Sequence, residues 1–169
     1  MDPRTGLGRF RNFRISNYAL MEEMINWCST MNIHEIMAEA DVRERIELYW
    51  DQTEKFIDMV KQHTTVQNKI IISDLRGVDP IYTGNRFLIY GLYPDANISV
   101  WIVNGKGGNG CSAAVGYSIM NRTCTIDVGA LMLKYGGGGH RVVGTCQFSD
   151  DTMEEKLEQL LSDMKRMNS

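Results

Sequence analysis

The sequence predicts an α/β protein, with a helical N-terminal part, a long connector helix, and a small mixed sheet of about four or five strands flanked by helices. Three observations indicate this class. Apolar residues recur at intervals of three and four before Gln67, short β-branched runs alternate with glycine-rich turns after it, and the last stretch returns to a helical period. With 169 residues, of which 43% are hydrophobic, the chain is long enough to bury a core.

The first part of the chain is expected to be helical. Ser16 can cap a helix whose apolar positions are spaced by three and four residues, namely Leu20, Met21, Met24, Ile25 and Cys28. A second helical stretch begins near Ile33. The same period continues without proline from Asp41 to His63, with charged residues on the opposite face, and this predicts a connector helix that packs one stripe against a globular body.

The remaining part of the chain is expected to form the sheet. The segments KIIIS, NISVWIV, CSAAVGYSIM and RVVGTCQF predict strands, and NGKGGNG predicts a hairpin turn between the second and third of them. RFLIYGLYP fits either a helix that ends at Pro94 or a strand. Two further helices are expected. Asp127 caps the first, and Asp150 or Asp151 caps the second, with Glu154 reaching back to the cap.

Composition excludes several classes of protein. A net charge of −3 argues against a protein that coats long nucleic acid by charge alone. In RFRNFR, arginines alternate with Phe10 and Phe13, and anchoring of a loop is favoured over a grip on nucleic acid. No apolar run is long enough to cross a membrane, and no signal peptide is evident, so we expect a cytoplasmic protein without a membrane partner. The cysteines lack C-x-x-C spacing and are expected to be reduced core thiols: Cys28, Cys111, Cys124 and Cys146.

The stretch KYGGGGH, from Lys134 to His140, places four glycines between a predicted helix and a predicted strand. Gly136 sits where a helix end favours a positive φ, and the other three glycines need another reason. Successive backbone N–H groups can form an anion-binding nest, to which His140 and Arg141 would add charge-assisted hydrogen bonds. A flexible linker is the alternative. The run is not a Walker loop, because it follows a helix and no Lys-Ser/Thr pair comes after it.

These residues carry a family resemblance. KYGGGGHRVVGTCQF resembles the GGGGH signature of the C-terminal domain associated with DHH-superfamily phosphoesterases. GYSIMNRTCTIDVGALMLKYGGGGH is similar to the strand, polar loop and helix that lead into that signature, and NRFLIYGLYPDANISV resembles the exopolyphosphatase-related branch. The resemblance covers most of the chain from about residue 68 onward. It implies a domain that binds substrate in short-oligonucleotide exonucleases, bisphosphonucleotide phosphatases, cyclic-dinucleotide phosphodiesterases and exopolyphosphatase-related proteins.

The resemblance also implies a domain organisation. Residues 1–40 would be the remnant of a catalytic DHH domain, 41–67 the connector helix, and 68–169 the substrate-binding domain. DPRTGLGRF resembles the stretch that carries the last metal-binding aspartate, which would make Asp2 a ligand of a divalent metal, usually manganese. The name-giving Asp-His-His triplet is absent from this sequence. We therefore expect a fragment of a longer phosphoesterase that binds no metal by itself and does not hydrolyse phosphodiesters alone.

The resemblance assigns substrate contacts to particular residues. The glycine run and its histidine would hold substrate phosphate: Gly136, Gly137, Gly138, Gly139 and His140. A family arginine that contacts phosphate falls at Asn121 or Arg122, and the fork of Arg122 fits phosphate oxygens better. Ser118 is a further candidate. We expect a Cβ at Gly138 to block the ligand and strain the backbone, and loss of the His140 side chain to weaken binding without unfolding the domain.

Three functions follow as candidates. The first is the substrate-binding portion of the phosphoesterase, whose partners would be the upstream catalytic domain and a short oligonucleotide, a phosphorylated nucleotide or polyphosphate. The resemblance also leaves room for a homodimer. The second is a stand-alone nucleotide-binding or nucleic-acid-binding module that never had catalytic metals. The third is a structural or oligomerisation domain in which the glycine run serves only packing.

Overall fold

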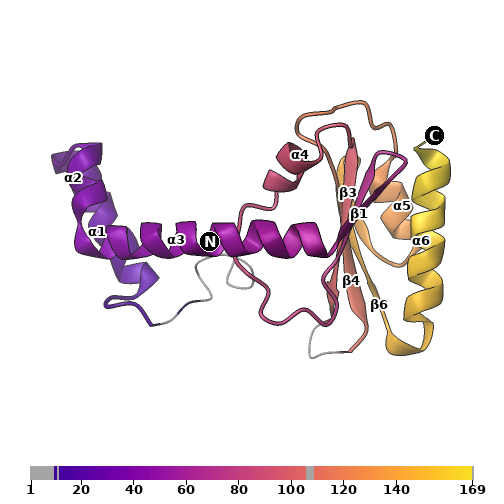
Figure 1. Cartoon of the computed structure of the whole chain (residues 1–169), viewed down its shortest axis with the longest axis horizontal. Helices are drawn as coiled ribbons and strands as arrows, with labels where there is room; N and C mark the ends of the chain where they lie inside the picture. The colour runs from indigo at the N-terminus through magenta and orange to yellow at the C-terminus, as the bar shows by residue number, and fades with distance from the viewer. Residues whose placement is uncertain (1–9, 11, 106–108, 169) are drawn as a thin grey trace. The chain divides into compact units, whose positions relative to one another are not determined.

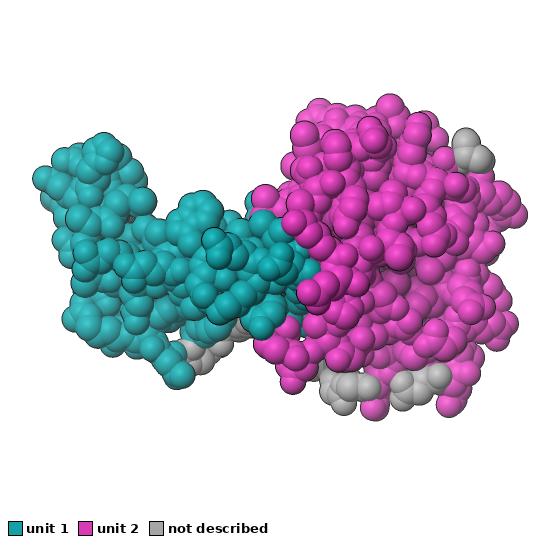
Figure 2. Space-filling view, viewed as in Figure 1, with its two compact units in different colours: residues 1–59, 81–85 teal, residues 60–80, 86–169 magenta. Residues whose placement is uncertain are grey.

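A computed structural model of the chain describes residues 10, 12–105 and 109–168 and confirms the α/β class (Figure 1). The chain divides into two compact units (Figure 2). One comprises Met1–Met59 with Ile81–Asn85, and the other comprises Val60–Pro80 with Arg86–Ser169. The first boundary therefore falls within a helix, α3 (Ala40–Gln62), which is the connector that the sequence predicts.

The first unit contains α1 (Asn17–Thr30), α2 (Ile33–Ala38) and most of α3. Ser16 caps α1 as predicted, since its hydroxyl accepts a hydrogen bond from the Ala19 N–H at 3.0 Å. Asn32 and Glu35 form a capping box at the start of α2, in which each side chain bonds the other residue's N–H. These caps satisfy N–H groups that the first turns of the helices leave without partners.

The apolar stripe predicted for α1 is only partly buried. Leu20 is buried with Ile36 and Val42, but Met21 and Ile25 are 49% and 66% exposed. A core of so few side chains covers only a narrow sector of the helix, so the neighbouring apolar positions stay in solvent. Cys28 is also exposed, so the prediction of a core thiol is wrong there, whereas the other three cysteines are buried.

A segment of the first unit returns to α3 from a distant part of the sequence. The Thr83 N–H donates to the Gln52 Oε1 at 3.2 Å. A Cβ added to Gly84 would lie 2.3 Å from the Phe56 ring, so the backbone of this segment runs directly against that side chain. Ile81–Asn85 is therefore held by packing on the helix, although Val60–Pro80, which separates it from the helix in sequence, belongs to the second unit.

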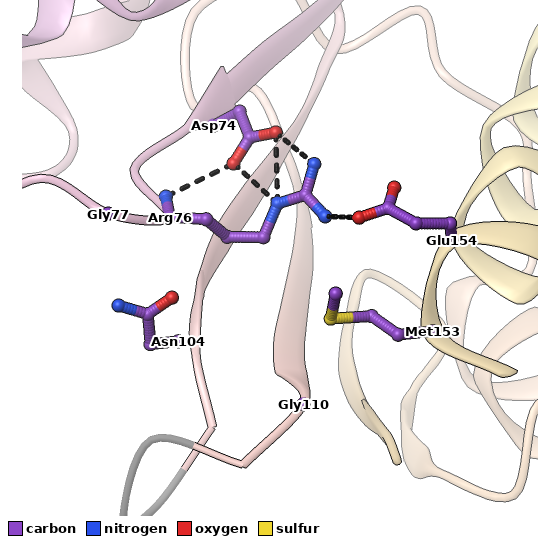
Figure 3. Close-up of a pocket in the computed structure, with 7 residues that line it drawn as sticks. All are labelled: Asp74, Arg76, Gly77, Asn104, Gly110, Met153 and Glu154. Carbon is purple, nitrogen blue, oxygen red and sulfur yellow. Dashed lines mark hydrogen bonds and ion pairs between the residues drawn. The ribbon is translucent and has the colours of Figure 1, made fainter. Parts of the chain in front are cut away.

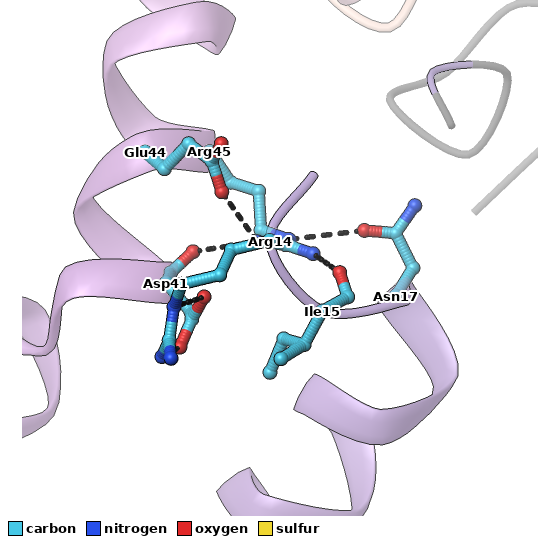
Figure 4. A network of polar contacts seen from close by, with 6 residues as sticks. All are labelled: Arg14, Ile15, Asn17, Asp41, Glu44 and Arg45. Carbon is cyan, nitrogen blue, oxygen red and sulfur yellow. Dashed lines mark hydrogen bonds and ion pairs between the residues drawn. The ribbon is translucent and has the colours of Figure 1, made fainter. Parts of the chain in front are cut away.

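The first unit also contains a network around two arginines (Figure 4). Arg14 forms an ion pair with Asp41, which is only 4% exposed. Arg45 donates to the Ile15 carbonyl at 2.6 Å and stacks over the Phe13 ring at 4.0 Å. These contacts favour the anchoring interpretation of RFRNFR for its described residues, whereas Arg9 and Arg11 lie outside the described part of the chain.

The second unit is built on a mixed six-stranded sheet with the order β1-β2-β3-β4-β6-β5. Only β2 and β3 are parallel, and the other pairs are antiparallel. The predicted strands correspond to β2 (Ile70–Asp74), β3 (Ile98–Asn104), β4 (Cys111–Tyr117) and β6 (Val143–Phe148). The sheet exceeds the predicted four or five strands because two short edge strands join it: β1 (Thr64–Gln67) and β5 (Gly138–His140). Neither edge strand carries an alternating apolar pattern that would predict it.

The two faces of the sheet differ. Alternate residues of β3, Ile98, Val100 and Ile102, enter the main core on one face. Figure 1 shows α5 (Val128–Lys134) and α6 (Met153–Met167) on that face, and their Met132 and Leu160 are fully buried. The opposite face carries Ser99 and Trp101 of β3 beside α4 (Leu88–Leu92), and RFLIYGLYP thus contains a helix. The fold leaves this second face available for a site.

The start of α6 differs from the prediction. A 3₁₀ turn (Asp150–Thr152) precedes the helix, and the N-cap residue Thr152 makes no side-chain cap bond. Glu154 does not reach back to the cap, because its carboxylate bonds the Arg76 guanidinium at 2.6 Å. By contrast, Asp127 caps α5 as predicted, accepting from the Ala130 N–H at 3.0 Å.

Candidate ligand-binding site

The open face of the sheet holds a cavity of about 460 Å³. Its floor is formed by residues of β3, β4 and β6, its first wall by α4 and the two residues before it, and its second wall by the loop after β4. This volume is typical of a pocket for a small molecule of nucleotide size. The residues that line it and are used below are Arg86, Phe87, Trp101, Gly116, Ser118 and Arg122.

Tyr90 fixes α4 on the sheet. Its hydroxyl lies 2.7 Å from the Ser99 Oγ and donates to the Gly116 carbonyl at 3.0 Å. Burial raises the pKa of Tyr90, so the hydroxyl stays protonated at neutral pH and can act as a donor. The first wall of the cavity is therefore held in place by hydrogen bonds to the floor.

We expect Tyr90→Phe to lower the free energy of unfolding by about 1 kcal/mol, because it deletes these bonds while keeping the ring. Urea denaturation of both proteins measures the difference. Tyr93→Phe is a matched control on the same segment, and an equal loss in both variants would contradict the role given to the Tyr90 hydroxyl.

The second wall is a loop whose polar groups are mostly satisfied within the loop. The buried Ser118 Oγ accepts from the N–H groups of Met120 and Asn121 at 3.2 and 3.0 Å. Asn121 donates from its amide to the Asp95 carbonyl at 2.8 Å and accepts from Thr123. Ser118 and Asn121 thus shape the loop, and the geometry favours Arg122 as the residue that faces a ligand.

Arg122 and Arg86 differ from most arginines in the described part of the chain. Each of five others forms an ion pair: Arg14, Arg43, Arg45, Arg76 and Arg166. Arg122 makes one weak bond to the Ile119 carbonyl at 3.3 Å, and Arg86 contacts the Phe87 ring, but neither has a carboxylate partner within the described residues. No acidic residue lines the cavity. The cavity therefore collects positive charge that the fold leaves uncompensated.

Arg141 also lacks a carboxylate partner among residues 12–105 and 109–168, but it does not line the cavity. Burial raises the pKa of Tyr117, and Arg141 opposes this rise through its charge and a hydrogen bond. The Tyr117 side chain packs on the main core with Cys124 and Ile126, so this contact places Arg141 beside the core face of the sheet and not at the cavity. His140 is exposed on the same hairpin but does not line the cavity.

The glycine run, Gly136–Gly139, packs closely against its neighbours, a role that the sequence supports only as an alternative. The N–H groups of Gly136 and Gly137 donate to carbonyls of the last turn of α5, so they do not form a free anion nest. Gly136 has a φ of 76°, as predicted. A Cβ at Gly137 would lie 2.1 Å from the Thr145 carbonyl oxygen, and one at Gly139 would lie 2.3 Å from that of Val143.

Gly138 behaves differently from its neighbours. Its φ is not positive, and an added Cβ would find no heavy atom within 4 Å. The expectation that a Cβ at Gly138 strains the backbone is therefore wrong, because the close approaches of β5 to β6 fall on the glycines on either side of it.

The described residues do not fit the metal pair that the resemblance implies. Among residues 10, 12–105 and 109–168, no three His, Cys, Asp or Glu side chains gather in a way that could hold a metal ion. His34 and His63 are exposed on separate elements. Asp2, the predicted ligand, lies outside the described residues.

A second hollow, of about 410 Å³, lies between the end of β2 and the start of α6 (Figure 3). Its charges are compensated within it. Arg76 donates to both carboxylate oxygens of Asp74, at 2.9 and 2.6 Å, and to Glu154 at 2.6 Å. The arrangement indicates a latch between sheet and helix, since no charge remains unpaired for a ligand.

This latch predicts a pH dependence of stability. Burial raises the pKa of Asp74, but hydrogen bonds and charge from Arg76 outweigh it, so the pKa is lower than usual. A lowered carboxyl pKa stabilises the fold above the unfolded-state pKa of about 3.9, and this stabilisation is lost as pH falls through the folded-state pKa. We expect Arg76→Ala to destabilise the protein near neutral pH and to approach the wild type as the pH falls below the lowered pKa of Asp74.

Urea denaturation across this pH range measures the difference, with Arg43→Ala as the control because its carboxylate partner is 4.0 Å away and both groups are exposed. A difference between wild type and Arg76→Ala that stays constant with pH would contradict the latch.

Comparisons with known proteins identify relatives among solved structures. No protein-family model and no curated protein sequence matches the chain. The pGpG-specific phosphodiesterase PggH from Vibrio cholerae is 42% identical with a TM-score of 0.91, and the match covers 98% of this chain and 57% of that chain. An exopolyphosphatase-related protein from Bacteroides fragilis is 13% identical with a TM-score of 0.53, covering 89% and 44% of the two chains. The DHH domain of a member of the s1p family of ribosomal proteins is 16% identical with a TM-score of 0.56, covering 83% and 36%.

The last two structures share the α/β fold of this chain, and one of them is a DHH domain. With the match to PggH added, the chain is consistent with the C-terminal domain of a DHH-superfamily protein. It spans 57% of the length of PggH. None of the helices formed by the described residues is long and apolar enough to cross a membrane.

Proposed function

We propose that this chain is the substrate-binding C-terminal portion of a metal-dependent DHH-family phosphoesterase, and that the intact enzyme hydrolyses a short linear dinucleotide of the pGpG kind. Similarity to PggH, which is described as pGpG-specific, supports the choice of a dinucleotide over a mononucleotide or polyphosphate. The remainder of the intact enzyme would supply the catalytic domain and its divalent metal, manganese by family resemblance, with Asp2 as one ligand.

A single observation carries the proposal: two arginines without carboxylate partners among the described residues line one cavity. Arg86 lines it from the first wall and Arg122 from the second. A guanidinium that makes no ion pair in the fold is available for phosphate oxygens, which it binds through two parallel N–H groups. This local charge is compatible with the net charge of −3, since a short ligand needs only a few cations.

Within this proposal the residues of the chain bind and orient the substrate. Arg122 holds a phosphate from the second wall, and His140, exposed on the β5–β6 hairpin outside the cavity lining, is the further phosphate contact that the family resemblance implies. Trp101 and Gly116 form a floor over which the sugar and base can lie. Positioning of this kind contributes to catalysis by presenting phosphorus to the reacting groups in a fixed orientation.

The glycine run itself gives less support to phosphate binding, because its first two N–H groups are already used by α5. Close packing at Gly137 and Gly139 favours the alternative in which the run is a packing device. This alternative concerns the run alone. It leaves the uncompensated arginines unexplained, and a purely structural domain has no need of them.

Calorimetric titration of the 169-residue chain with pGpG tests the proposal. Saturable binding to the wild type, weakened by loss of Arg122, supports it. Absence of binding to pGpG, to a nucleoside monophosphate and to polyphosphate overturns it in favour of the structural domain.

We expect the purified chain to show no manganese-dependent hydrolysis of pGpG, because the described residues form no metal site. Release of GMP, measured by anion-exchange chromatography, is the readout, and a longer protein that includes the catalytic domain is the positive control. Manganese-dependent turnover that persists after purification of the chain to homogeneity would contradict the proposal that this chain only binds substrate and the remainder of the enzyme catalyses hydrolysis.

A further inference from the structure

Arg86 and Phe87 lie side by side in the chain immediately before α4, and both line the cavity. The Arg86 guanidinium carbon is 5.4 Å from the centre of the Phe87 ring, and 43% of the Phe87 side chain is exposed. The Phe87 ring lies 6.5 Å from that of Tyr90 at an angle of 31°. Because Tyr90 is bonded to the sheet, the aromatic wall beside Arg86 is held in place.

The floor opposite this wall includes Gly116, which has no side chain. Gly116 lies in the middle of the sheet, where glycine weakens a strand and is kept where another group approaches closely. The fold itself does not require this glycine, since an added Cβ would meet only the Val143 Cγ2 at 3.8 Å and the Tyr90 hydroxyl at 4.0 Å. The space above Gly116 belongs to the cavity and is open to a flat ligand.

The two walls offer different chemistry. The second wall, with Arg122, has no aromatic residue and suits phosphate. The first wall offers the exposed ring of Phe87, with the Arg86 guanidinium 5.4 Å from the ring centre and over the ring. An arginine fork matches the O6 and N7 acceptors of guanine, whereas adenine presents an N6 donor in place of O6 and repels one arm of the fork.

We propose that Arg86 and Phe87 form a nucleobase subsite in which a guanine stacks on Phe87 above Gly116 while Arg86 binds its O6 and N7. The subsite rests on the proposed function, because it needs a nucleotide whose phosphate lies at Arg122. In this proposal, residues of this chain recognise the base. Arg86 and Phe87 then select the substrate by its base, whereas Arg122 binds its phosphate.

The test compares GMP with AMP, and pGpG with pApA, by calorimetric titration of the 169-residue chain. We expect the wild type to bind the guanine ligand about tenfold more tightly than the adenine ligand. Arg86→Ala and Arg86→Lys should both abolish this preference, because the lysine keeps the charge but lacks the fork. Phe87→Ala should lower the affinity for both the guanine and the adenine ligand about tenfold and preserve the preference for guanine.

Gly116→Val provides a variant that leaves the chemistry of both arginines intact. It should melt close to the wild-type temperature, because an added Cβ would meet no heavy atom closer than 3.8 Å, and it should still lose base-dependent binding. Arg43→Ala, a surface change in the first unit, controls for altered net charge. Far-ultraviolet circular dichroism confirms that each variant is folded.

The outcomes separate the two proposals. Equal affinity of the wild type for guanine and adenine ligands, with both lost in Arg122→Ala, overturns the base subsite and leaves the phosphate site standing. A guanine preference that survives Arg86→Ala also overturns the subsite. Failure of the wild type to bind any of the four ligands overturns the proposed function and the subsite together.

Discussion

Arg122→Ala is expected to lower the affinity of the chain for pGpG by about 10–150-fold, which corresponds to about 1.5–3 kcal/mol for hydrogen bonds to a charged group. The guanidinium makes a single weak bond within the described residues, at 3.3 Å, so its removal costs the fold little. The loss should therefore appear in binding and leave the melting temperature unchanged.

Calorimetric titration at two salt concentrations measures this effect, because a lost phosphate contact also reduces the dependence of affinity on salt. Arg122→Lys separates charge from geometry and should recover only part of the affinity. Arg166→Ala removes an exposed arginine that is paired with Asp163 and should bind as the wild type does. Equal affinity of Arg122→Ala and Arg166→Ala would mean that the cavity does not hold phosphate at this wall.

Gly137→Ala is expected to destabilise the second unit by about 3 kcal/mol, the upper end of the cost of overpacking. The added Cβ would lie 2.1 Å from the Thr145 carbonyl oxygen and 2.8 Å from the Cys146 Cα, and both are backbone atoms that cannot move alone. The strand β6 would have to shift away from the end of α5. We expect the melting temperature to fall by about 10–20 °C.

Gly138→Ala is the matched control, one residue away in the same run. Its Cβ would point into open space and its φ is not positive, so its melting temperature should match the wild type. Differential scanning calorimetry of the two variants side by side measures the contrast. Equal destabilisation at both positions would mean that the run is constrained as a whole and not at the contacts between β5 and β6.

Much of this fold could be predicted because its signals are local. Ser16 and Asp127 cap their helices through side chains that lie within three residues of their partners. The strands of the core have apolar residues at every second position, and this period belongs to the sequence alone. The positive φ of Gly136 could likewise be predicted from its place at a helix end.

Other features could not be predicted because they depend on long-range contacts. Glu154 has the spacing of a capping residue, but Arg76, 78 positions earlier, binds it instead. The strand β5 consists of two glycines and a histidine, and only pairing with β6 makes it a strand. In the site, the sequence indicated Arg122, whereas Arg86 carried no signal, since whether an arginine is paired can be known only from its neighbours in the fold.

The path of the chain between its two units limits how evolution or an experimenter can divide it. The backbone passes from one unit to the other three times, after Met59, Pro80 and Asn85, so the sheet does not form an uninterrupted stretch of sequence. A fragment that starts after Met59 would retain Ile81–Asn85 but lose Gln52 and Phe56, on which that segment packs. A transplantable binding module therefore has to begin upstream of Gln52 and carry part of the connector helix with it.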